Sequence, residues 1–217
     1  MADICTAKQA IESITEGMTL MIGGFLGVGT PEGLVQALVE QGTENLTVIC
    51  NDTAFPGKGV GKLQDNRQIS KLYASYIGGH PGTGKMMESG EMEVILVPQG
   101  SLAEKIRAAG SGLGGFLTPT GVGTIVAQDK QEVSIKGKTH LLELPLYADV
   151  ALLKAYKADQ SGNLIYRLSA RNFNPLMAMA AKRVIVEVEE ICPMGLLDPD
   201  HIITPGIFVD CLVKEGS

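Results

Sequence analysis

Glycines and apolar residues are interleaved in one short segment, Gly23-Gly24-Phe25-Leu26-Gly27-Val28-Gly29. It follows the apolar run Thr19 to Ile22 and precedes a segment of helical period that begins near Thr30. A glycine-rich loop between a strand and a helix presents backbone N–H groups, which can bind an anion or a carbonyl oxygen. The loop does not match the dinucleotide-binding pattern, because Glu32 stands where the third glycine belongs. The alternative is a tight turn that only packs against the protein.

Two further clusters of polar residues accompany this loop. Asn51-Asp52 comes directly after the apolar run Leu46 to Cys50, so it places a polar donor at the carboxyl edge of a sheet. The alternative for this pair is an ordinary Asx turn. The segment Ser169 to Pro175 gathers an arginine and two asparagines around a phenylalanine. Its alternative role is a polar cap on the helix that begins at Pro175.

A third segment, residues 79–85, has the glycine and lysine spacing of a phosphate-binding P-loop. That loop requires Ser or Thr at the next position, where the hydroxyl binds Mg²⁺, but Met86 stands there. The stretch from Met86 to Glu93 is too short for the helix of the motif, and the next strand ends in Pro98 rather than a metal-binding Asp. We therefore expect a mobile surface loop.

Nucleophilic hydrolysis and metal chemistry find no support in the residue pattern. The chain contains no G-x-S-x-G motif. His80, His140 and His201 are isolated from one another, so their spacing indicates neither a catalytic triad nor a zinc site. We expect each histidine to be a surface or structural residue, and we expect no bound metal.

The composition excludes several classes of protein. With 45% hydrophobic and 19% charged residues, the 217-residue chain can bury a substantial core, so we expect one domain over residues 1–217. A net charge of −6 argues against a nucleic-acid groove. The longest apolar stretch, Leu20 to Gly29, is too short to span a membrane. We expect reduced, mostly buried thiols in a cytoplasmic protein, because no C-x-x-C pair occurs among the four cysteines, Cys5, Cys50, Cys192 and Cys211.

Short apolar runs alternate with segments of helical period along most of the chain. The expected strands are Thr19–Ile22, Leu46–Cys50, Ile69–Ile77, Val94–Val97, Val150–Lys154, Val184–Val188 and Ile207–Val213. The expected helices follow a capping box at Thr6 to Gln9, follow Thr30 as cap with Pro31 first, span Ser101–Ala109, and lie near Pro175–Ala181. Because the strands are continuously apolar, the pattern predicts an α/β fold with an open, mainly parallel sheet and flanking helices. A small β-hairpin is expected outside this pattern, at Glu132–Ile135 and Thr139–Leu142.

Residues Gly17 to Pro31 combine a glycine, an apolar triplet, Gly-Gly-Phe and a final Gly-x-Pro. This pattern resembles the signature of family I CoA-transferase α subunits, with Glu16 in place of the usual Asp or Asn. Further matches cover most of the chain, at residues 51–52, 75–78, 98–104, 118–124 and 169–175. Among the branches of the family, the sequence looks most similar to the α subunits of acetate, acetoacetate and butyrate CoA-transferases.

The resemblance implies that CoA moves from a short-chain acyl-CoA to a free carboxylate, with no metal and no permanently bound cofactor. In the family a glutamate carboxylate attacks the thioester, and an acyl-glutamyl anhydride and a glutamyl-CoA thioester follow. That glutamate lies in a Ser-Glu-Asn-Gly motif of the β subunit, and the motif is absent here. The resemblance therefore implies a β-subunit partner, in a heterodimer or a dimer of heterodimers, and no catalytic nucleophile in this chain.

The same resemblance assigns roles to particular residues. It implies contact with CoA or the acyl oxygen for Gly23, Gly24, Phe25, Leu26, Gly27, Val28 and Gly29. Asn51 and Gln99 are expected to face the reacting carbonyl, and Phe25 to exclude water from the anhydride. The alternative function is a non-catalytic module of the same α/β class that binds CoA or a sugar phosphate.

Overall fold

The central strands are apolar on both faces because helices cover both sides of the sheet. The computed structural model describes residues 2–216. In strand β2 (Thr19–Ile22), Leu20 and Ile22 belong to one core and Met21 to the other, and all three are fully buried. Since side chains alternate between the faces of a strand, a continuous apolar run feeds two cores at once.

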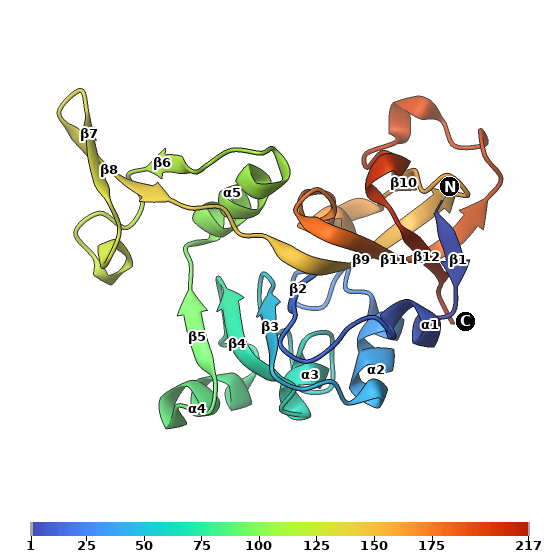
Figure 1. Ribbon diagram of the computed structural model, residues 1–217, viewed down its shortest axis with the longest axis horizontal. Coiled ribbons are helices and arrows are strands. Elements are labelled where there is room, and N and C mark those ends of the chain that lie inside the picture. The colour runs from blue at the N-terminus through green and yellow to red at the C-terminus, as the bar shows by residue number, and fades with distance from the viewer. Residues whose placement is uncertain (1, 217) are drawn as a thin grey trace.

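One large sheet forms the middle layer (Figure 1). Its order is β1 (Asp3–Cys5), β12 (Cys211–Lys214), β11 (Ala181–Cys192), β9 (Ala148–Asp159), β2, β3 (Leu46–Ile49), β4 (Ile69–Ala74) and β5 (Glu93–Leu96). These strands are parallel, and the short β10 (Leu164–Ile165) pairs antiparallel with β9. The prediction of an open, mainly parallel sheet with flanking helices is confirmed.

Helices cover the two faces of this sheet (Figure 1). One face carries α1 (Ala7–Ile11), α2 (Glu32–Gln41), α3 (Gly61–Asp65) and α4 (Pro81–Ser89). The other carries α5 (Gln99–Gly110) and α6 (Asn174–Ala178). Short 3₁₀ turns occupy Ile125–Ala127, Leu168–Arg171, Pro199–His201 and Gly206–Phe208. Of the helices in residues 2–216, even the longest, α5, falls short of what a membrane-spanning helix needs.

A small antiparallel sheet projects from the main body beyond the edge strand β5 (Figure 1). It contains β6 (Phe116–Thr118), β8 (Lys138–Glu143) and β7 (Glu132–Ile135), in that order. The predicted hairpin is confirmed as β7 and β8, whereas β6 was not predicted. Glu143 joins this sheet to α5, because its carboxylate bonds Lys105 at 2.9 Å and Lys130 at 2.6 Å. Burial opposes ionisation of Glu143, but these two lysines outweigh it and lower its pKa.

Several predictions about local structure are wrong. Residues 81–89 are helix α4 rather than a surface loop, and the glycine and lysine of the P-loop pattern lie inside that helix. The expectation of four reduced thiols is wrong for one pair. Cys5 and Cys211 are disulfide-bonded, with their Cα atoms 7.0 Å apart, and link β1 to β12.

Element ends were also harder to predict than element positions. The capping box at Thr6 and Gln9 is present, but α1 ends at Ile11 rather than near Gly17. Strand β4 ends at Ala74, three residues before the predicted end at Ile77. Helix ends and strand ends depend on neighbouring elements, so a local pattern places them less well than it places the middle of an element.

Replacing Leu152 by alanine should lower the free energy of unfolding by about 2–5 kcal/mol. Leu152 lies at 0% exposure in the middle of β9, and truncation would leave a cavity that the neighbouring strands cannot fill. Urea unfolding measures this loss. Ile125→Ala serves as the control, because Ile125 is 84% exposed and its truncation should change stability by less than about 0.5 kcal/mol. Equal losses in the two variants would contradict the assigned core.

Candidate active site

The order of the strands reverses next to β2, and this reversal defines the candidate site. From β2 the sheet continues through β3, β4 and β5 in one direction and through β9, β11 and β12 in the other. Open α/β sheets bind ligands outside the carboxyl ends of the strands at such a switch point. The pairing of β2 with β9 ends where Gly23 N donates to Leu152 O at 3.0 Å. The loop that follows β2 therefore opens at the switch point.

Residues Gly23 to Gly29 form a tight reverse turn whose tip is exposed. Phe25 and Val28 exchange two backbone hydrogen bonds of 3.0 and 2.9 Å. Between them, Leu26 (φ 48°) and Gly27 (φ 83°) are left-handed, as in a type I′ turn. Phe25 and Val28 are 44% and 46% exposed, so the turn presents two apolar side chains at the edge of the sheet.

Internal packing explains the glycines of this loop. A Cβ atom at Gly23 would overlap the side chain of Asn174, and one at Gly29 would overlap the backbone of Ala170. A packed turn therefore accounts for these glycines as well as a ligand does. Support for a ligand at this loop comes instead from its position and from the polar residues beside it.

Asn174 connects the loop to β9 and to the segment before α6. It is fully buried, and its Oδ1 accepts a hydrogen bond from Lys154 N at 3.0 Å. Its Nδ2 donates to Gly29 O at 3.0 Å and to Ala170 O at 2.9 Å. The side-chain amide thus satisfies a β9 backbone group that β2 does not reach.

Asn172 holds the same loop through two further residues, Gly24 and Val28. Its Oδ1 accepts from Gly24 N at 3.2 Å, and its Nδ2 donates to Val28 O at 2.9 Å. The alternative of a polar helix cap is wrong for this segment, because α6 begins at Asn174 with Phe173 at its cap position and no capping side chain. The two asparagines of residues 169–175 instead fix the glycine loop.

At the ends of the next three strands, Asn51, Ser75 and Gln99 form one hydrogen-bonded group. Gln99 Nε2 donates to Asn51 Oδ1 at 2.7 Å. Ser75 Oγ lies 2.7 Å from Gln99 Oε1 and 3.1 Å from Asn51 Oδ1. The structure therefore brings together the two amides that the sequence resemblance selected. Ser75, which the sequence placed only in a matching motif, connects them.

Cys50 and Asp52, on either side of Asn51, are both buried. Asp52 is 5% exposed and accepts three N–H hydrogen bonds, from Leu26, Ala54 and Asn51. Burial raises the pKa of the Cys50 thiol well above its ordinary value, and the charge of Asp52 raises it further. Cys50 therefore stays protonated, and a neutral buried thiol is a poor nucleophile.

Glu187 is a structural partner of the loop that sequence reasoning missed. Its Oε2 accepts from Gly33 N at 2.7 Å and Leu34 N at 2.9 Å, the first turn of α2. Thr30 was expected to cap this helix, but Pro31 holds the cap position and makes no side-chain cap bond. The helix N-terminus is thus already occupied by a carboxylate and does not offer these N–H groups to a ligand. The sequence offered one signal for Glu187, a charged residue inside the apolar run Val184–Val188.

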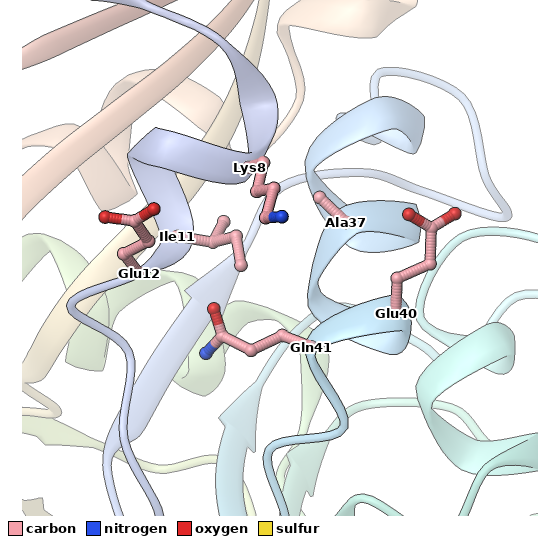
Figure 2. Close-up of a pocket in the computed structure, with 6 residues that line it drawn as sticks. All are labelled: Lys8, Ile11, Glu12, Ala37, Glu40 and Gln41. Atoms are coloured by element: carbon pink, nitrogen blue, oxygen red, sulfur yellow. The ribbon is translucent and has the colours of Figure 1, made fainter.

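Other candidates lie apart from this edge. Figure 2 shows a hollow between α1 and the second half of α2, with Lys8, Ile11 and Gln41 among its lining residues. Because α2 runs back from the carboxyl edge, its second half lies toward the amino ends of the strands. His80 is buried and contacts Asp65 at 3.0 Å, a structural role. Within residues 2–216, no cluster of three or more His, Cys, Asp or Glu side chains could hold a metal ion.

Comparison with known proteins now adds to this geometry. The family model described as "Coenzyme A transferase" matches residues 4–215. The chain belongs to the coenzyme A transferase family. It is 54% identical over 210 residues to "Acetate CoA-transferase subunit alpha" of Escherichia coli (strain K12), covering 97% of this chain and 96% of that relative. It is 53% identical to the "Acetoacetyl-CoA:acetate/butyrate CoA transferase alpha subunit" of Clostridium acetobutylicum, covering 93% of each.

Other members of the coenzyme A transferase family broaden the comparison. Relatives from Bacillus subtilis and Helicobacter pylori, 49% and 45% identical, carry names of the succinyl-CoA:3-ketoacid coenzyme A transferase type. An acyl-CoA transferase from E. coli O157:H7, solved as a thioester complex with CoA, has a TM-score of 0.89 at 21% identity. The match covers 99% of this chain and 47% of that one. At this identity the similarity shows the shared fold alone.

Asn174→Ala should lower the free energy of unfolding by about 2–4 kcal/mol. The change leaves Lys154 N without its partner in a buried position, and Gly29 O and Ala170 O without a partner in half-buried positions. Chemical denaturation measures the effect. Asn66→Ala, which removes one exposed hydrogen bond to Lys62 O, should cost less than about 1 kcal/mol. A loss at Asn174 no larger than at Asn66 would argue against the proposed anchoring of the loop.

Proposed function

We propose that this chain is the α subunit of a CoA-transferase that moves CoA between a short-chain acyl-CoA and a free carboxylate. The acyl groups are acetyl, acetoacetyl or butyryl, and the nucleophilic glutamate belongs to a β subunit. The observation that carries the proposal is the group Asn51–Ser75–Gln99, placed beside the glycine loop at the switch point of a coenzyme A transferase fold. The names of the acetate relative from Escherichia coli and the acetate/butyrate relative from Clostridium acetobutylicum support the same substrates.

The side-chain amides suit the charge that develops in this reaction. When a carboxylate attacks a thioester, the carbonyl oxygen becomes an oxyanion, which N–H donors stabilise. An amide group carries two N–H donors. Asn51 Nδ2 uses one on Asp52, and Gln99 Nε2 uses one on Asn51 Oδ1. Each therefore keeps a second donor for the oxyanion, a role that the occupied N-terminus of α2 is not free to fill.

The carboxylate at this site is unsuited to act as the nucleophile. Asp52 is buried, and all three of its hydrogen bonds hold the protein chain itself. The sequence also contains no Ser-Glu-Asn-Gly motif. A partner must then supply the attacking glutamate, and the exposed turn with Phe25 and Val28 is the surface that meets the substrate. Apolar side chains there exclude water, which would otherwise hydrolyse an anhydride intermediate.

Reconstitution tests the proposal. The chain is mixed with a β subunit that carries Ser-Glu-Asn-Gly, acetyl-CoA and labelled butyrate or acetoacetate, and the label in the CoA thioester is measured. We expect transfer only with both subunits, and borohydride reduction after acyl-CoA treatment should modify a glutamate on the β subunit. Binding of CoA without transfer, with every β subunit tried, would support the non-catalytic binding module instead. Succinyl-CoA as a second donor distinguishes the acetate type from the succinyl type.

Asn51→Ala should lower kcat on the order of 10²-fold in the reconstituted enzyme, because it removes one oxyanion donor. Steady-state kinetics with acetyl-CoA measures the change, and thermal unfolding verifies that the variant is folded. Asn66→Ala, at the end of α3, is the control and should keep the wild-type kcat. An unchanged kcat in Asn51→Ala would leave Asn51 with a structural role only.

A further inference from the structure

The carboxylate of Asp52 gathers donors from three parts of the candidate site. Oδ2 accepts from Leu26 N, in the turn of the glycine loop, at 2.9 Å, and from the side-chain amide of Asn51. Oδ1 accepts from Ala54 N at 2.7 Å. Asp52 is 5% exposed, so its charge is stabilised by these N–H groups and hardly by water.

Two of these donors belong to residues in an unusual conformation. Leu26 has φ 48° and Ala54 has φ 50°, in the left-handed region that residues with a side chain rarely adopt. Such a conformation costs free energy and persists only where surrounding contacts hold it. One carboxylate accepts the N–H of both, so Asp52 closes the turn of the glycine loop and the turn after β3 together.

The third donor is the residue proposed to stabilise the oxyanion. Asn51 Nδ2 gives one proton to Asp52, which fixes the direction of its second proton. Gln99 and Ser75 both donate to Oδ1 of the Asn51 amide. The amide oxygen therefore faces these two residues, and the NH₂ group faces Asp52. Asp52 is therefore the side chain that bonds both the Asn51 amide and the turn of the loop.

We propose that Asp52 is a positioning residue for CoA transfer, which locks the glycine-loop turn and the Asn51 amide into one fixed relation. This inference rests on the proposed function and deepens it. Asp52 does not touch the substrate. It acts because the loop and the amide must meet the same thioester, and a displacement of about 1 Å at a reacting centre can cost 10²-fold in rate.

The variant Asp52→Asn breaks the contacts of Oδ2 to Leu26 N and to the Asn51 amide. An asparagine keeps the size of the side chain and one acceptor oxygen, which can retain the bond to Ala54 N. Its NH₂ group then faces the N–H of Leu26 and the NH₂ of Asn51, so donors oppose donors. In the enzyme reconstituted with its β subunit, we expect kcat to fall about 10- to 100-fold, while KM for acetyl-CoA changes less than about threefold.

Asp159→Asn is the matched control. Asp159 is 3% exposed and also accepts two backbone N–H groups and one amide, from Ser161 and Asn163, but at the far end of β9. It should lose stability in the same way as Asp52→Asn, because the same kind of bond is broken. It should keep the wild-type kcat per folded complex.

A second substitution distinguishes positioning from a general loss of structure. Leu26→Gly supplies a residue that adopts φ > 0 without strain, so the turn no longer needs the carboxylate. We expect Leu26→Gly to raise kcat of Asp52→Asn at least about fivefold, whereas the same substitution in the wild-type complex should not raise kcat. This rescue, measured per folded complex, would not occur if Asp52 only stabilised the fold.

The wild-type complex distinguishes a failure of the proposed function from a failure of the positioning role of Asp52. If it transfers no CoA with any β subunit, the proposed function fails. If it is active and Asp52→Asn keeps its kcat, or Asp159→Asn loses as much kcat, or Leu26→Gly does not raise kcat of Asp52→Asn, the positioning role of Asp52 is overturned. A kcat loss confined to Asp52→Asn and reversed by Leu26→Gly supports it.

Discussion

The end of the pairing between β2 and β9 is the constraint on which this site depends. β2 stops at Ile22 and its last backbone bond joins Gly23 to Leu152, while β9 continues to Asp159. The next N–H of β9 on that side, at Lys154, then needs a partner, because a buried backbone donor without one is costly. Asn174 supplies it and, in the same group, holds the loop that departs from β2.

Two carboxylates from other strands hold the segment that leaves β2. Asp52, after β3, accepts the N–H of Leu26 in the loop, and Glu187, in β11, accepts two N–H groups at the start of α2. Glu187 also pairs with Lys154 at 3.1 Å, so its own charge is balanced. Loop and helix are thus anchored at both ends by groups on opposite sides of the switch point. A rigid frame of this kind suits a site that must hold a thioester in one orientation.

Sequence reasoning predicted the middle of most strands in residues 2–216, but not β1, β6 or β10, and it missed the contacts between strands. Apolar runs such as Thr19–Ile22 carry their own signal, because burial on both faces leaves no polar position. The bonds that build the site join residues far apart in sequence, such as Asn172 with Gly24 and Glu187 with Gly33, and no local pattern encodes them. The resemblance selected Asn51 and Gln99 as groups that face the reacting carbonyl, and the structure places the two amides in contact. The sequence singled out Asp52 and Asn174 as polar residues, but no local pattern predicted the distant partners that they bind. The same limit explains the expectation that Thr30 caps α2.

The N–H groups that are already hydrogen-bonded at the start of α2 are consistent with the proposed division of the chemistry between two subunits. In the first turn of α2, the N–H groups of Gly33 and Leu34 are bound to Glu187, so they are not free for a phosphate or an oxyanion. The donors left in the proposed site are the side-chain amides of Asn51 and Gln99 and the hydroxyl of Ser75, and none of them carries a charge. Under the proposed function, a site of this composition stabilises developing charge and leaves the nucleophile to a partner subunit. In the proposed function the attacking glutamate comes from a β subunit, and the turn at Phe25 to Val28 is exposed at the edge of the proposed site.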